Sequence, residues 1–139
     1  MHTFFIQARH FQLAAERCME ERQLPNNQFQ WLPIPYVVNA AFACELYLKG
    51  ILEKNDVKIP AKHDLKCLYN LLPYNIRKII KHTFEDKNMI FENELKMAKD
   101  LFLKWRYIHE DILKGNEISA NLAFIRLFLD ILSKTSKQL

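Results

Sequence analysis

The sequence contains few of the residues that build turns. Only 2 glycines and 5 prolines occur among its 139 residues. A sandwich or barrel of short strands needs a tight turn roughly every dozen residues, and such turns favour glycine and proline. These shortages argue against an all-β protein. We therefore expect an all-α protein, one up-and-down bundle of about five helices that forms a single domain over residues 1–139.

Several chemical signatures are also missing. The 3 cysteines are far apart, with no CxxC pair or His/Cys cluster, so we predict neither a metal site nor a cofactor. The sequence has no Gly-rich phosphate loop, HExxH or GxSxG motif. It also has no basic-then-apolar leader and no apolar run of about 20 residues. We expect a cytoplasmic protein that does not enter a membrane, with cysteines that act as small buried hydrophobes.

Charge of one sign is not in large excess. The 20 Lys and Arg residues against 16 Asp and Glu residues give a net charge of +4, and both signs are interleaved along the chain. This balance permits contact with RNA or DNA without requiring it. Half of the residues are hydrophobic, so the chain can bury a core.

Apolar residues recur at steps of three and four, which predicts helices. The expected helices cover about residues 4–22, 35–54, 65–71, 75–84, 91–113 and 119–133. Residues 35–54 are apolar nearly all round, so we expect this helix at the centre of the bundle. Asp64 is expected to cap the helix that follows it. Prolines keep residues 25–35 irregular, and Gly115 with Asn116 is expected to end the long helix before them.

Glu45 is the most informative polar residue of the expected central helix. A buried carboxylate costs several kcal/mol unless a cation meets it. Lys49 lies one turn along the same helix, whereas Arg106 belongs to the expected helix over 91–113. We favour Arg106, because a guanidinium can make two parallel hydrogen bonds to a carboxylate. The alternative is that such a pair only fixes the register of the helices.

The segment from Trp105 to Glu110 has the densest cluster of polar and aromatic side chains. Arg106 and His109 are three residues apart, so on one helix they would point to one side. An imidazole can move a proton and a guanidinium can hold a phosphate, which is the chemistry of metal-independent RNA cleavage. The competing interpretation is that His109 packs in the core and that Arg106 only pairs with a carboxylate.

His63 and Asp64 offer a second possible acid–base pair. The adjacent imidazole and carboxylate could exchange protons. We favour the simpler interpretation, in which Asp64 caps the next helix and His63 packs against its neighbours.

Three segments in this order resemble the HEPN domain family: 39–49, 63–73 and 105–110. The similarity covers about residues 4–132. It implies a helical bundle that usually dimerises. Many members are ribonucleases of toxin–antitoxin or phage-defence systems, often encoded beside a small nucleotidyltransferase. Their active site is an arginine followed, after four to six residues, by a histidine at the dimer cleft.

This chain departs from the family spacing. Arg106 matches the family arginine, but only two residues separate it from His109, and the positions that would fit hold Asp111, Ile112 and Leu113. The departure favours a binding module over a nuclease.

The resemblance implies that this module binds RNA, a nucleotide or a protein partner in an RNA-associated defence or toxin–antitoxin system. A homodimer and a nucleotidyltransferase-type antitoxin are the implied partners. One alternative is a metal-independent endoribonuclease that uses Arg106 and His109, and another is a purely structural dimerisation domain. The candidate ligand-binding residues are Asn39, Glu45, Lys49, Tyr107 and Glu110.

Overall fold

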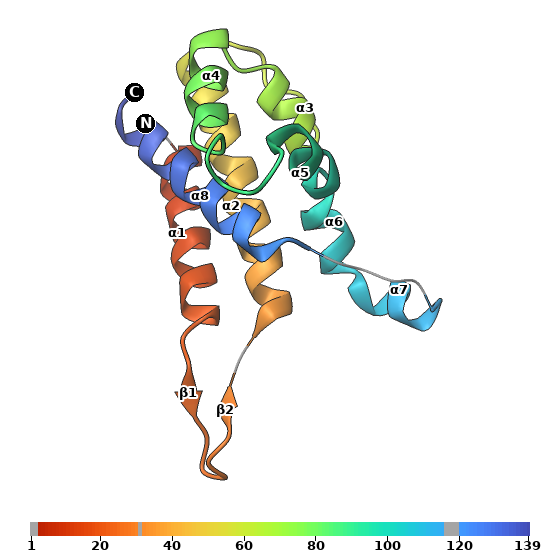
Figure 1. The fold of residues 1–139 in the computed structure, drawn as a ribbon. Coiled ribbons are helices and arrows are strands. Elements are labelled where there is room, and N and C mark those ends of the chain that lie inside the picture. The colour runs from red at the N-terminus through yellow and green to blue at the C-terminus, as the bar shows by residue number, and fades with distance from the viewer. Residues whose placement is uncertain (1–2, 31, 116–119) are drawn as a thin grey trace.

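The computed structural model describes residues 3–30, 32–115 and 120–139, and in them the protein is a helical bundle with one short hairpin (Figure 1). Its helices are α1 (Thr3–Cys18), α2 (Pro33–Lys54), α3 (Leu65–Asn70), α4 (Tyr74–His82), α5 (Phe91–Ala98), α6 (Leu101–Arg106), α7 (Ile108–Leu113) and α8 (Leu122–Lys137). The strands β1 (Arg22–Gln23) and β2 (Phe29–Gln30) pair antiparallel. The predicted all-α class is confirmed.

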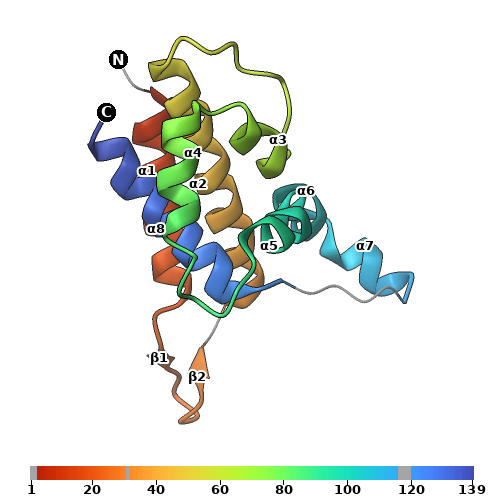
Figure 2. The same ribbon diagram turned by 45° about the horizontal axis from the view of Figure 1, so that its top comes forward.

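Helix α2 is the central element, as its apolar sequence predicts. It packs on α1, α8, α6 and α3. Helices α1 and α8 lie on one side of it and α3, α5 and α6 on the other (Figures 1 and 2).

Cys44 is fully buried in α2, and this burial raises the pKa of its thiol well above the usual value. A Cβ atom at Gly50 would overlap the ring of Phe5, so a glycine lets α1 approach α2 closely.

One buried polar contact ties three helices together. The hydroxyl of Tyr47 in α2 donates to Gln12 Oε1 in α1 at 2.6 Å, and Ser133 Oγ in α8 lies 3.4 Å from the same hydroxyl. Burial raises the pKa of Tyr47. Because all three residues are buried, the contact fixes how α1 and α8 meet the central helix.

An aromatic core lies beneath α4 and α5. Phe128 in α8 is fully buried, with its ring centroid 5.5 Å from Phe124 and 6.0 Å from Phe91. Phe84 lies 4.9 Å from Phe91, and Tyr69 in α3 also lies 4.9 Å from it. Burial, with a smaller contribution from Glu92, raises the pKa of Tyr69 to about 12. These rings join the short helices to α8.

The first helix ends earlier than its sequence predicts. Helix α1 ends at Cys18 instead of residue 22, and a hairpin replaces the irregular segment expected after it. Leu24 and Gln28 close the turn, with the Leu24 N–H donating to the Gln28 carbonyl at 2.6 Å. Asn27 has a φ of 64°, a left-handed conformation that asparagine tolerates better than most residues.

The continuous helix expected over residues 91–113 was wrong. The segment forms three helices, α5, α6 and α7, with breaks at Lys99–Asp100 and at Tyr107. At the first break the carbonyl of Lys99 accepts a hydrogen bond from the N–H of Leu65 at 3.0 Å. Leu65 is the first residue of α3, so its N–H has no partner within that helix, and the break supplies one. Ile112, expected in the core, is 60% exposed, because α7 projects from the bundle and buries no residue (Figure 1).

Helices α3 and α8 both begin after a residue whose side chain caps the helix. Asp64 is the N-cap of α3, and its carboxylate accepts a hydrogen bond from the N–H of Cys67 at 3.0 Å, as expected. Helix α8 begins at Leu122 after the cap Asn121, and it continues to Lys137, beyond the expected end. Asn116 and Ser119, the expected stop and start in this region, lie outside the described residues. No helix in the described segments has both the length and the apolar character to span a membrane.

Candidate functional site

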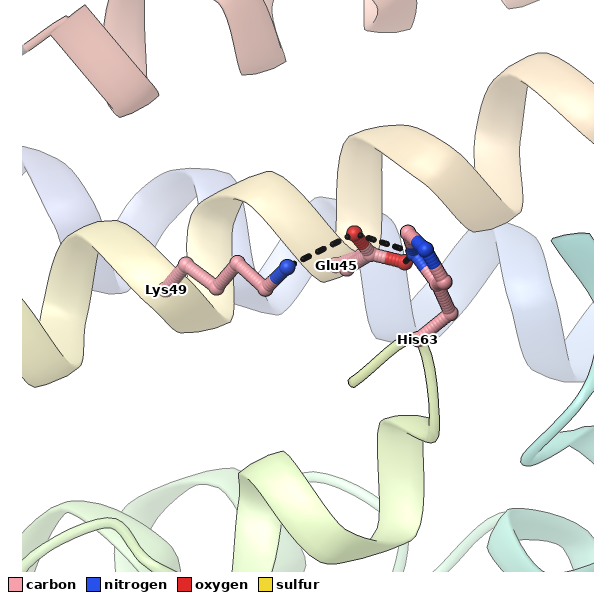
Figure 3. A network of polar contacts seen from close by, with 3 residues as sticks. All are labelled: Glu45, Lys49 and His63. Carbon is pink, nitrogen blue, oxygen red and sulfur yellow. Dashed lines mark hydrogen bonds and ion pairs between the residues drawn. The ribbon is translucent and has the colours of Figure 1, made fainter. Parts of the chain in front are cut away.

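A buried carboxylate organises a cluster of three side chains between α2 and the start of α3 (Figure 3). Glu45 in α2 is 1% exposed. Lys49, one turn further along α2, donates from Nζ to Glu45 Oε2 at 3.1 Å. His63 approaches from the loop before α3, with Nδ1 2.9 Å from Oε1 and 3.0 Å from Oε2. We call Glu45, Lys49 and His63 the carboxylate cluster.

The predicted ion pair between Glu45 and Arg106 was wrong. Glu45 bonds Lys49 and His63, whereas Arg106 lies exposed at the end of α6. A partner four residues along the same helix is already in place when the helix forms. The Lys49 side chain is only 13% exposed, so this pair is also more buried than the surface pair that its spacing suggests.

Arg106 instead lies against aromatic rings. Its Cζ atom lies 4.9 Å from the ring centroid of Phe102 and 4.7 Å from that of Tyr107. Such cation–π contacts hold a guanidinium in place without neutralising its charge. Among the residues that the structure describes, no carboxylate pairs with Arg106.

The carboxylate cluster and Arg106 meet at the ring of Phe102. The Phe102 ring stacks on Phe42 of α2, with centroids 4.4 Å apart and an interplanar angle of 18°, so its position is fixed by the bundle. The imidazole of His63 lies 5.7 Å from the same ring, between centroids. We call His63, Phe102, Arg106 and Tyr107 the stacking face. It combines three rings and a guanidinium in one connected group.

The structure does not bring the other predicted site residues into this group. The amide of Asn39 lies 4.0 Å from Cys18 Sγ, which directs it toward α1. His109 and Glu110 are exposed on α7, whereas Arg106 ends α6, and the break at Tyr107 separates the two helices. His109 is therefore not a core residue, and the two candidate catalytic residues do not share one continuous helix.

Sequence reasoning missed His63 as a partner of Glu45. Because His63 is adjacent to Asp64, its sequence position predicted either a helix start capped by Asp64 or a His63–Asp64 dyad. The structure gives each residue its own task, since Asp64 caps α3 while His63 bonds Glu45. A buried glutamate predicts some cationic or donor partner, and His63 was one of the few candidates near a helix start.

Two further observations concern the described segments around this site. No group of three or more His, Cys, Asp or Glu side chains in the described segments is arranged to hold a metal ion. The indole Nε1 of Trp105, in α6, is buried and has no hydrogen-bond partner within those segments. The side chains of the stacking face can supply proton transfer by an imidazole, anion binding by a guanidinium and stacking on rings.

Comparison with known proteins finds no matching family model, no matching curated protein and no matching solved structure. The resemblance to HEPN domains therefore rests on the three sequence segments, and it stays a prediction.

Proposed function

We propose that the protein is a binding module for single-stranded RNA, or for a nucleotide of the same chemistry, and that the stacking face is its binding site. The observation that carries this proposal is the exposed Arg106, whose guanidinium contacts the rings of Phe102 and Tyr107 and has no carboxylate partner among the described residues. Unpaired bases stack on aromatic rings and guanidinium planes, and a guanidinium binds phosphate oxygens.

The charges near the stacking face favour an anionic ligand. Lys62 directly precedes His63 in the chain, and Lys104 lies on the side of α6 opposite to Phe102 and Arg106; both lysines are exposed. Within the described ranges, neither lysine has a carboxylate within 4.0 Å. Such cations would neutralise RNA phosphates and release the counterions condensed on them, which makes the affinity depend on salt.

The resemblance to HEPN domains supports the biological setting of the proposal. In that setting the module acts in the cytoplasm, as a homodimer, in an RNA-associated defence or toxin–antitoxin system with a nucleotidyltransferase-type antitoxin. The exposed apolar side chains of α7, Ile112 and Leu113, are available to a second copy.

Equilibrium binding to labelled oligonucleotides tests the proposal. Fluorescence anisotropy with a single-stranded RNA of mixed sequence should show saturable binding that weakens as salt is raised. Arg106→Gln should weaken it by about 1–3 kcal/mol, roughly 5- to 150-fold, because the stacked cation is lost. The matched control is Arg77→Gln, which removes an arginine that lies 5.7 Å from the ring of Tyr74 on α4. Competition by mononucleotides and by single-stranded DNA identifies the preferred ligand.

Two outcomes would overturn the proposal. One is the absence of saturable binding to RNA, DNA and mononucleotides at low salt. The other is an equal loss of affinity in the Arg106→Gln and Arg77→Gln variants, since the effect would then reflect net charge and not the stacking face.

A further inference from the structure

A groove of about 1020 Å³ opens between the second half of α1 and the first half of α8, over the start of α2. Helices α1 and α8 lie on the other side of α2 from α6, and the described residues that line the groove include none of the stacking face (Figures 1 and 2). Much of its lining is aliphatic, from Ala15, Met19, Leu122 and Leu127. A groove of this size accommodates a small organic molecule.

Two buried side chains that line the groove have hydrogen-bond donors without a partner. Tyr36 in α2 is 5% exposed, and its hydroxyl forms no hydrogen bond with a described residue. Gln12 in α1 is 6% exposed; its Oε1 accepts from Tyr47, whereas its NH₂ group donates to no described acceptor. In the described segments the indole nitrogen of Trp105 is the one side-chain polar atom that is fully buried and unpaired. The donors of Tyr36 and Gln12 are therefore accessible, and the groove is the space into which they open.

The charges around the groove leave one cation unmatched. Three carboxylates line it, and each has a cation within 4.0 Å: Glu16 with Arg9, Glu20 with Arg22 and Asp130 with Lys134. Arg126 in α8 also lines the groove, and no carboxylate of a described residue lies within 4.0 Å of its guanidinium. The groove therefore has a cation for which the described part of the protein supplies no counterion.

The guanidinium of Arg126 and the buried donors face the same space. Burial raises the pKa of Tyr36, with a smaller contribution from Cys44, while the charge of Arg126 acts in the opposite direction. The guanidinium is therefore near the hydroxyl, and at neutral pH this hydroxyl keeps its proton. Tyr36, Gln12 and Arg126 thus offer donors, which fit a group that only accepts hydrogen bonds, an ionised carboxylate. A phosphate monoester fits less well, because its nearly two negative charges would face the three carboxylates of the lining.

We propose that this groove binds a monocarboxylate with an aliphatic chain, a ligand of the fatty-acid class. The carboxylate accepts hydrogen bonds from Tyr36, Gln12 and Arg126, and the chain packs on the aliphatic lining. Because the chain adds apolar contact, each further CH₂ group that the groove covers should strengthen binding about two- to fourfold. This ligand is independent of the RNA proposed for the stacking face.

Titration of the full chain with sodium octanoate, followed by ¹H–¹⁵N NMR, tests the proposal. Octanoate should bind saturably and shift the amide signals of residues 12–20, 36 and 122–130, whereas acetate should bind far more weakly. Three probes keep the octyl chain and change the head: 1-octanol without charge, octylammonium with the opposite charge and octyl phosphate with a larger negative charge. Each should bind more weakly than octanoate, and the first two at least about tenfold, because they lose the charge-assisted hydrogen bonds.

Two variants test the residues that hold the carboxylate. Arg126→Gln should weaken octanoate binding at least about tenfold, and Tyr36→Phe about two- to tenfold. Tyr36→Phe should keep the wild-type unfolding midpoint, since the hydroxyl has no described partner to lose. The matched controls on α4 are Arg77→Gln and Tyr74→Phe, whose side chains lie outside the groove. Both controls should bind octanoate like the wild type.

The proposal is overturned if octanoate does not bind saturably or shifts only signals outside the groove. It is also overturned if 1-octanol, octylammonium or octyl phosphate binds as tightly as octanoate, because the groove would then not select a monocarboxylate. An equal loss of affinity in the Arg126→Gln and Arg77→Gln variants would show an effect of net charge and would equally remove the proposed site. None of these outcomes bears on RNA binding at the stacking face.

Discussion

Replacing Lys49 with methionine is expected to lower the free energy of unfolding by about 3 kcal/mol, because it leaves a buried carboxylate without its cation. Glu45 is 1% exposed and Lys49 13%, and their charged groups are 3.1 Å apart. Arg106→Met should cost less than about 1 kcal/mol, since Arg106 is exposed and forms no ion pair with a described residue. Urea unfolding followed by circular dichroism measures both values.

The double variant Glu45→Leu with Lys49→Met provides the control. Removing both charges eliminates the unpaired carboxylate, so the double variant should be more stable than Lys49→Met alone. His63 is nearly half exposed and tolerates the loss of its partner through solvation. If Lys49→Met and Arg106→Met have equal small effects, Lys49 is not the cation that compensates Glu45.

Phe128→Ala is expected to have an effect of similar or larger size, about 3–5 kcal/mol. Its ring is fully buried between Phe91 and Phe124, so truncation leaves a cavity where α8 meets the short helices. The same unfolding measurement detects the loss. The matched control is Phe29→Ala in β2, where the side chain is 63% exposed and the expected change is within about 0.5 kcal/mol. Equal effects in the two variants would contradict the assignment of the aromatic core.

The sequence was sufficient to predict the parts of the fold that depend on local patterns. The apolar run of α2 predicts a central helix, and Asp64 predicts a cap, because both signals lie within a few neighbouring residues. The breaks between α5, α6 and α7 have no such signal, since neither proline nor glycine lies there. The first break instead depends on a hydrogen bond from Leu65, which is distant in sequence.

The candidate site was predictable in part for the same reason. Burial of Glu45 followed from its position in an apolar helix, and it required a partner. The identity of that partner depended on how the loop before α3 returns to α2, which brings His63 to the carboxylate. The preference for Arg106 assumed that one long helix would pass beside Glu45. Instead α6 ends at Arg106, and the guanidinium of Arg106 lies against the ring of Phe102.

The central claim is that the buried carboxylate of Glu45 accepts a hydrogen bond from Nδ1 of His63, which leaves the lone pair of the neutral imidazole on Nε2. Long-range ¹H–¹⁵N NMR of the histidine side chains measures the position of the proton directly. The structure predicts that neutral His63 carries its proton on Nδ1. A proton on Nε2 of His63 would contradict the claim, because Nδ1 could then not donate to the carboxylate and Nε2 could not accept a proton.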